Sequence, residues 1–320
     1  MIRLEKVKNV LLVLLLALFT AALILFPSEA ADAARQGLVL CFRTVLPSLF
    51  PFFVLSSLFV ATGAADAVGR VLEPVMRPLF YLSGAGASAL VLGLVGGYPV
   101  GARTTAELYR GGSLAKAEAE RLLSFCNNAG PGFILGICGG AVFGSVRAGL
   151  YLYLVHVAAA VLAGVALRRC SLMECDAERS LRRRRGNASS SKASRSSLAA
   201  FPACVRDSFA AVWSVCGFVV LFAVVLRFAA MLLPAGAEGR CAYPLLLGFV
   251  ELTNGVMALA SDRGGFVLCA ALLAWGGLSV HAQTLSVLEG TDLSPRLYFL
   301  GKAAQTALSV PLALLVSALL

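Results

Sequence analysis

The sequence predicts an all-α, polytopic membrane protein: an inverted repeat with re-entrant hairpins and broken helices, preceded by one extra N-terminal span. Three observations predict this class, namely the apolar composition, the recurrence of polar breaks in both halves, and the placement of basic residues. Of the 320 residues, 59% are hydrophobic and only 14% are charged, whereas soluble domains carry roughly 25% charged residues. Several apolar runs reach the roughly 20 residues that a helix needs to cross a bilayer, and none alternates like the strands of a β-barrel.

Residues 1–35 form the expected extra span. A short basic segment precedes the apolar run Val10–Phe26, which resembles the charged and apolar regions of a signal peptide. Ser28–Ala34 could serve as a cleavage site, but the apolar run is long for a signal peptide. We therefore favour an uncleaved span whose N-terminus lies in the cytoplasm.

The first repeat covers residues 36–167. It begins with a span over Gln36–Ala61, which Pro47 and Pro51 are expected to bend. We expect a loop over residues 63–86. A smoother apolar run near residues 148–167 closes the repeat.

The stretch 90–106 reads LVLGLVGGYPVGARTTA and is interrupted at its middle by glycine and proline. Gly is costly inside a helix, and Pro removes a backbone donor and clashes with the preceding turn. Lipid cannot satisfy the backbone groups that a break frees, so the break must be buried in protein or line a polar cavity. We interpret it as part of a binding site; the alternative is a kinked structural helix, since Gly and Pro are frequent in membrane helices. The candidate residues at and beside the break are Gly96, Gly97, Tyr98, Pro99 and Arg103.

A second break interrupts Leu122–Phe143, where Asn127 and Asn128 are followed by Ala-Gly-Pro-Gly. Between the two breaks, Glu107–Arg121 is amphiphilic. Its Gly111-Gly112-Ser113 predicts a helix stop and a new N-cap.

Residues 168–206 form a basic, Ser- and Arg-rich segment. It holds ten Lys or Arg and three Asp or Glu, so it carries +7 of the net charge of +10. The Ser-rich composition is typical of a disordered linker. Clustered Arg beside membrane spans usually marks the cytoplasmic side, so we expect a cytoplasmic linker and no nucleic-acid partner.

The second repeat, residues 207–320, follows the order of the first. The two halves align at two places. The segment GFVELTNGV, which starts at Gly248, aligns with GLVGGYPVG, which starts at Gly93. The segment LLAWGGLSVHAQ, which starts at Leu272, aligns with LLSFCNNAGPGF, which starts at Leu122. Finally, LYFL in the second half matches LYLY in the first. Identity between the halves is weak, but a polar break recurs at the same place in both.

Charge placement decides the expected orientation. If 90–106 dips into the bilayer and returns, the basic residues of the first half and the linker all stay in the cytoplasm. If the stretch crossed fully, ten basic residues would lie outside. The hairpin makes the first repeat begin from outside and the second from inside. Inverted repeats with broken helices near the midplane are the architecture of many secondary transporters.

Glu251 is the carboxylate that lies well inside an apolar segment. A carboxylate at this depth costs several kcal/mol unless it is paired, protonated or hydrated. We interpret it as a proton-coupling or substrate-gating group; the alternative is a structural ion pair, for example with Arg103.

Further polar residues in the apolar segments are candidate substrate ligands. Asparagine amides offer donors and acceptors, and helix N-termini at the breaks would offer N–H groups to an anion. The alternative for each is a hydrogen bond between helices. Tyr98 could stack on a ring or simply pack. His156 lies in a smooth span, where we expect a satisfied core histidine. The candidates in this class are Asn127, Asn128, Asn254, Ser279, His281 and Gln283.

The sequence supports no enzyme, metal or cofactor. The nine cysteines are scattered, mostly in apolar runs, with no CxxC pair and no zinc-like spacing. No motif brings a nucleophile, a base and an orienting group together.

Five segments in order also resemble a known family: LPSLFPFFVLSSLFV, GLVGGYPVGART, AERLLSFCNNAGPGFILG, GFVELTNGV and WGGLSVHAQTLSVL. They are similar to the YlbJ-type sporulation integral membrane proteins of the nucleoside-recognition (Gate) family, over roughly Gly37–Leu320. The resemblance makes residues 36–167 and 207–320 two gate-type repeats. It implies action in the mother-cell membrane around the forespore, and movement of dipicolinic acid towards the spore. The motif positions that it carries over are Gly96, Gly97, Tyr98, Pro99, Asn127, Asn128, Glu251, Asn254, His281 and Gln283.

These observations predict a transporter of a small organic anion, with its site between the repeats and with proton or ion coupling as an option. Arg103 and broken-helix N-termini suit carboxylates, and Tyr98 or Trp275 could face an aromatic ring. The alternative is a non-transporting membrane scaffold for the spore envelope, for which the linker would be the indispensable part. The partners expected are the anion and the lipid bilayer.

Overall fold

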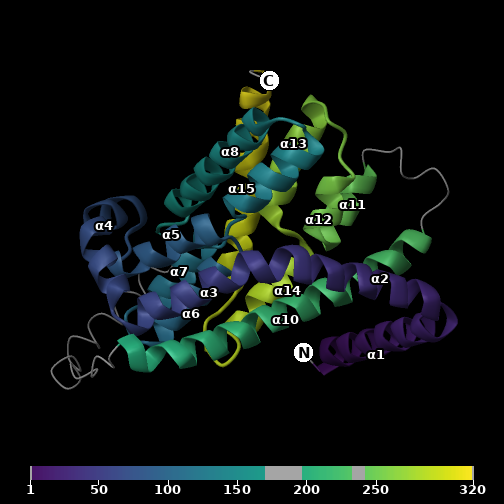
Figure 1. The fold of residues 1–320 in the computed structure, drawn as a ribbon, viewed down its shortest axis with the longest axis horizontal. Coiled ribbons are helices and arrows are strands. Elements are labelled where there is room, and N and C mark those ends of the chain that lie inside the picture. The colour runs from purple at the N-terminus through teal and green to yellow at the C-terminus, as the bar shows by residue number, and fades with distance from the viewer. Residues whose placement is uncertain (1, 170–196, 233–241, 319–320) are drawn as a thin grey trace.

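A computed structural model describes residues 2–169, 197–232 and 242–318 of the chain (Figure 1). Over these residues the fold is all-α, as the sequence predicts. The elements of the first half are α1 (Ile2–Leu25), α2 (Pro27–Leu40), η1 (Cys41–Val45), α3 (Leu46–Ala61), α4 (Ala64–Phe80), η2 (Gly84–Gly86), α5 (Ala87–Gly96), α6 (Val100–Arg110), α7 (Lys116–Cys126), η3 (Gly132–Val142) and α8 (Val146–Ala166). Those of the second half are α10 (Ser197–Met231), α11 (Ala242–Val250), α12 (Leu252–Met257), α13 (Arg263–Trp275), α14 (Gly277–Leu288) and α15 (Arg296–Ser317).

The apolar helices are long enough for a polytopic membrane protein. Four stretches of the described chain could each cross a bilayer, and two further pairs of helices qualify if each bent pair counts as one span. One bent pair, Val13–Leu25 with Pro27–Arg43, turns by 100° at Phe26. The predicted first span therefore exists as a helix, but the next helix begins at Pro27, earlier than the predicted residue 36. Pro27 occupies the first turn of α2, where its missing N–H costs nothing.

The loop predicted over residues 63–86 is wrong for most of its length. Residues 64–80 form α4, an amphipathic helix that lies at the edge of the molecule in Figure 1. Its buried face includes Met76 and Phe80, and Val71 is 76% exposed on the other side. The sequence predicts a loop here because Pro74 and Pro78, which lie inside the helix, usually interrupt one.

Each of the four predicted breaks is present. α5 stops at Gly96 and α6 starts at Val100, while α7 stops at Cys126 before the loop that leads to η3. In the second half, Glu251 separates α11 from α12, and Gly276 separates α13 from α14. The predicted stop after residue 110 is also present, although the N-cap of α7 is Ala115 rather than Ser113.

The two halves pack on each other in an exchanged manner. The repeat equates α6 with α12, and η3 with α14. In the structure α6 contacts α14, and α12 contacts η3. Likewise α15 contacts α7, and α13 contacts α8, although each helix also contacts its neighbour in its own half. Figure 1 shows α8, α13 and α15 gathered in one bundle, with α10 and α2 crossing beneath it. Such exchanged contacts are what a two-fold related pair of repeats requires. The orientation of each repeat in the bilayer stays a prediction from charge.

Glycines allow the crossing helices of each hairpin to touch. Added side-chain carbons at Gly93 and Gly101 would both overlap the carbonyl oxygen of Cys126 at the end of α7. In the second hairpin, a carbon at Gly255 would overlap the backbone of Gly248. Both hairpins are therefore closed by backbone contacts that a larger residue would prevent.

Gly301 provides a direct test of this packing. A Cβ there would overlap the carbonyl oxygen of Ser124, whereas Gly217 in α10 has no neighbouring atom within 4 Å of such a carbon. We expect Gly301→Ala to destabilise the protein by about 1–3 kcal/mol, the usual cost of overpacking. The control Gly217→Ala should be neutral or slightly stabilising, because alanine favours helix. Thermal unfolding in detergent measures both, and equal effects would contradict the close α7–α15 contact.

Polar contacts outside the apolar segments also join the halves. Tyr109 Oη donates to Asp292 Oδ1 at 2.6 Å, and Lys116 Nζ pairs with Asp292 Oδ2 at 3.1 Å. The hydrogen bond from Tyr109, and then that from Lys116, lower the pKa of Asp292 below its ordinary value. Arg110 donates to the carbonyl oxygens of Val287 and Glu289. The loop after α6 is thus tied to the loop after α14.

The predicted linker, 168–206, falls mainly on residues 170–196, which lie outside the described part of the chain. At its far end the helix α10 begins at Ser197, so residues 197–206 of the predicted linker are helical. The domain boundaries stay predictions.

Candidate functional site: a pocket where four helix breaks meet

The four breaks touch one another. A carbon added at Gly97 would lie 3.0 Å from the backbone nitrogen of Gly130, so the first and second breaks are in contact. One added at Gly276 would lie 3.9 Å from Tyr98 Cε1, which joins the fourth break to the first. One added at Gly277 would lie 3.2 Å from the nitrogen of Leu252, which joins the fourth to the third. Breaks from both halves of the chain therefore meet at one place.

Gly97 needs to be glycine for a second reason. Its φ of 83° with ψ of −179° lies in a region that is essentially reserved for glycine. This backbone turn ends α5 and redirects the chain into α6.

A pocket of about 300 Å³ lies at this meeting point. We call it the central pocket. Three of the breaks contribute to its wall, through residues 96–98, through Gly130 and Gly132, and through residues 251–253. The aromatic walls come from Phe52, Tyr98 and Phe133. Of the residues predicted as ligands, Gly96, Gly97, Tyr98, Glu251 and Gln283 line it.

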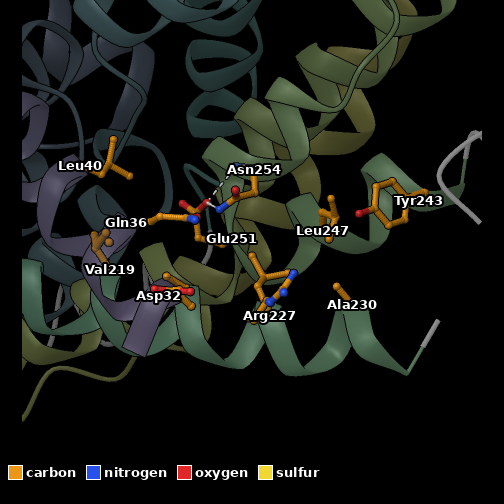
Figure 2. Close-up of a pocket in the computed structure, with 14 residues that line it drawn as sticks. Asp32, Gln36, Leu40, Val219, Arg227, Ala230, Tyr243, Leu247, Glu251 and Asn254 are labelled. Atoms are coloured by element: carbon orange, nitrogen blue, oxygen red, sulfur yellow. Dashed lines mark hydrogen bonds between the residues drawn. The ribbon is translucent and has the colours of Figure 1, made fainter. Parts of the chain in front are cut away.

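A second hollow, the outer groove, has a volume of about 350 Å³ and lies between α2, α10, α11 and α12. Its wall is more polar and includes Asp32, Gln36, Arg227, Tyr243 and Asn254. Figure 2 shows the side chain of Glu251 between those of Gln36 and Asn254. Glu251 also lines the central pocket, so its carboxylate stands where the two hollows adjoin.

The carboxylate of Glu251 caps α12. It accepts hydrogen bonds from the backbone nitrogens of Thr253 at 3.1 Å and Asn254 at 2.9 Å. The side-chain amide of Asn254 donates a third bond at 2.8 Å, drawn as a dashed line in Figure 2. Donors of this kind stabilise an ionised carboxylate at a helix N-terminus. The residue is only 6% exposed, and its capping role explains why an acidic residue is tolerated inside an apolar segment.

Arg103 lies away from both hollows. Its Nε pairs with Glu107 Oε1 at 2.8 Å, and its Nη2 donates to Ser57 Oγ at 3.0 Å and to Ser208 Oγ at 3.5 Å. The guanidinium also lies over the ring of Phe53 at 4.7 Å. An ion pair between Arg103 and Glu251 is therefore wrong for this structure, because Arg103 faces α3 and α10. Its role as a substrate ligand stays a prediction.

Asn127 and Asn128 lie in a buried polar network behind the pocket. Asn127 Nδ2 donates to Thr284 Oγ1 at 2.8 Å, and Asn128 Oδ1 accepts from Gln305 Nε2 at 3.0 Å. The backbone nitrogen of Ala129 donates to His156 Nε2 at 3.0 Å. The prediction of a fully hydrogen-bonded core histidine therefore holds for Nε2 of His156 but not for Nδ1, which has no partner within the described chain.

The predicted ligands on α14, namely Ser279, His281 and Gln283, form the other side of this network. Gln283 Nε2 donates to Ser279 Oγ at 3.2 Å, while His281 Nδ1 lies 2.7 Å from the hydroxyl of Tyr298. The indole of Trp275 stacks on Phe249 and meets His281 edge-on. Only Gln283 of this group reaches the central pocket. Pro99 precedes α6 as its N-cap, and Asn254 lines the outer groove.

Two functional candidates were missed by reading the sequence. Lys302 and Gln305 on α15 are both fully buried, and Lys302 Nζ donates to Gln305 Oε1 at 2.9 Å. A lysine three residues before a glutamine inside an apolar helix could have signalled them, because charge at this depth is rare. The outer groove adds Asp32 and Arg227, which sequence position alone did not connect to Glu251.

Among the described residues, no group of three or more His, Cys, Asp or Glu side chains could hold a metal ion. The six cysteines that the structure describes as free are all buried.

Comparison with known proteins agrees with the fold and with the motifs. The profile of the nucleoside-recognition (Gate) family matches residues 42–166. The chain is 29% identical over 335 aligned residues to the sporulation integral membrane protein YlbJ of Bacillus subtilis (strain 168), covering 94% of this chain and 81% of that protein. No solved structure matches the chain. The chain is therefore similar to the nucleoside-recognition (Gate) family over residues 42–166, and along most of its length it is similar to a sporulation integral membrane protein.

Proposed function

We propose that this protein transports a small organic anion across a membrane of the sporulating cell. The observation that carries the proposal is that four helix breaks, two from each half of the chain, touch one another, and that three of them line one central pocket. Secondary transporters place their substrate sites at such breaks between repeats, near the bilayer midplane. The similarity to a sporulation membrane protein supports the cellular setting. The mother-cell membrane around the forespore is the location we propose.

Dipicolinic acid is the substrate that the family resemblance implies. It is a small, flat aromatic dicarboxylate. The rings of Phe52, Tyr98 and Phe133 provide apolar walls for a flat ring, while Thr253 and Gln283 provide donors for a carboxylate. The hollow of about 300 Å³ is at the lower end of typical small-molecule sites.

Glu251 acts as the gate in this proposal. An anion that passes between the central pocket and the outer groove must pass this carboxylate, which lines both. Like charges repel strongly where water is scarce. Passage of the substrate therefore requires the carboxylate to move or to be neutralised, and Arg227 in the outer groove supplies a positive charge on that side.

Uptake by reconstituted vesicles tests the proposal. Vesicles with the protein should take up dipicolinate saturably, and empty vesicles should not. Phe133→Leu removes a ring from the pocket wall. It should raise the apparent KM about tenfold, because the flat aromatic ring of dipicolinate would lose a stacking partner.

Phe201→Leu is the matched control, since Phe201 is 50% exposed on α10. It should leave uptake unchanged. Absence of uptake by the wild-type protein, for dipicolinate and for other small aromatic carboxylates, would contradict the proposed function.

A further inference from the structure

We propose that Lys302 is the proton-carrying group of this transporter, so that it binds a proton in one conformation and releases it in the other. The inference rests on the proposed function, and it names the group through which that transport is coupled to protons. It starts from a buried amine that lacks the partner a buried charge requires.

Lys302 lies in α15 with no exposed surface. Its Nζ makes one hydrogen bond, to Gln305 Oε1 at 2.9 Å, and forms no ion pair within the described chain. An ammonium group offers three donors, and isolated charges in an apolar interior cost many kcal/mol. Lysines in membrane segments accordingly face water or pair with an acid. The amine of Lys302 has no acidic partner among the described residues and no exposed surface, so this conformation disfavours its charged form.

The surroundings of Lys302 are polar but incompletely bonded. Gln305 connects it to Asn128 Oδ1 at 3.0 Å and to the carbonyl of His156 at 3.4 Å. Nearby in this network, Asn127 Oδ1, His156 Nδ1 and His281 Nε2 have no partner among the described residues. Buried polar atoms are rarely left unpaired, and such a cluster suits water or a proton entering from one side.

The groups that face α15 supply no compensating negative charge. On α8 the titratable side chain in this network is His156, while the hydroxyl of Tyr153 donates to the carbonyl of Leu94 in α5. α7 contributes Cys126, α13 contributes Cys269, and α14 contributes His281, which is bonded to Tyr298. The acidic residues of α7, Glu118 and Glu120, lie in its first turns and bind the backbone nitrogens of Ser83 and Ser294.

Glu251 is less suited to carry the proton. Its carboxylate already accepts three N–H bonds and borders the polar outer groove. The carboxylate of Glu251 is thus held by three donors where it stands, whereas Lys302 Nζ makes a single hydrogen bond. We therefore assign the gating of the substrate path to Glu251 and the binding of the coupled proton to Lys302.

The coupling follows from position. Lys302 belongs to the second repeat, while Asn128, at the end of its network, belongs to a break of the first. Movement of one repeat against the other changes access of water to the amine. Opening lets the amine bind a proton, and closure in the present arrangement expels it.

Two modes of transport by reconstituted vesicles test the proposal, with dipicolinate as the probe. Net uptake driven by a pH gradient requires proton transfer, and exchange of internal for external dipicolinate does not. Lys302→Met keeps the length of the side chain but cannot bind a proton. We expect it to retain exchange within about twofold while gradient-driven uptake falls at least about tenfold. Lys116→Met is the control, because Lys116 is partly exposed and lies outside the network. Full gradient-driven uptake by Lys302→Met would overturn the assignment.

A second measurement does not depend on transport. If the folded protein holds Lys302 without a proton and the unfolded protein holds it with one, unfolding takes up a proton. Stability then rises with pH, up to roughly the ordinary lysine value near 10. Unfolding temperatures in detergent between pH 7 and 9 should rise more steeply for the wild type than for Lys302→Met. Parallel curves would overturn the proposal. Wild-type vesicles that fail to move dipicolinate, with curves that differ as expected, would sink the proposed function and leave the proton site standing.

Discussion

Replacing Gly97 by alanine is expected to abolish transport. The residue has a φ of 83°, and its added carbon would lie 3.0 Å from the nitrogen and 3.3 Å from the Cα of Gly130. Both neighbours are backbone atoms that cannot rotate away. The first break would therefore have to separate from the second, and the central pocket would change shape. We expect the rate of dipicolinate uptake to fall at least about 100-fold, since small displacements of a binding site have effects of this size.

Gly132→Ala is the matched control. Gly132 lines the same pocket, but a carbon added there would meet no atom within 4 Å. Uptake should stay within about threefold of wild type, because alanine costs nothing in a helix. Uptake measured for the two variants at equal amounts of folded protein separates the two cases. Normal uptake by Gly97→Ala would show that the meeting of the breaks does not matter.

Glu251 carries the second large effect. Glu251→Gln keeps the shape of the side chain and one acceptor for the α12 nitrogens, but removes the charge between the two hollows. We expect this variant to fold and to lose net accumulation of dipicolinate about tenfold or more, because a neutral side chain no longer closes the path between the two hollows and the anion leaks back. Glu251→Ala also removes the cap, which should cost about 1 kcal/mol of stability in addition.

The control for charge is Glu289→Gln, because Glu289 is exposed at the end of α14. It should change neither uptake nor unfolding temperature. If Glu251→Gln transported normally while Glu251→Ala did not, the residue would be a cap and not a gate.

The breaks could be predicted from the sequence because their causes are local. Glycine, proline and paired asparagines interrupt a helix wherever they occur in an apolar run. Gly96, Gly97 and Tyr98 were predicted in this way, while Glu251 was predicted as a carboxylate inside an apolar segment; all four line the central pocket. The repeat helped further, since it indicated that breaks far apart in the chain would meet.

The position of other polar residues could not be read from the sequence. Arg103 follows the first break closely, yet helix α6 turns it towards Glu107 and Ser57. Asn127 and Asn128 likewise face the interior rather than the pocket. Which side of a helix a residue presents depends on packing between helices, and a single break carries no information about it.

The burial of Lys302 could not be predicted from the sequence either. A lone lysine in an apolar run is easily assigned to the end of a span, where its chain can reach the membrane surface. Its complete burial follows from α7, α8 and α13 packing around α15. α4 was missed for a related reason, because its prolines predict a loop, while its amphipathic pattern becomes decisive only once a core exists to cover it.

A structure of the protein determined with dipicolinate would test the central claim most directly. The account predicts density for the ligand in the central pocket, against the ring of Tyr98 and within hydrogen-bond reach of Gln283, with Glu251 at its edge. Density confined to the outer groove beside Asp32 and Arg227, or an empty central pocket at a concentration that saturates uptake, would contradict it.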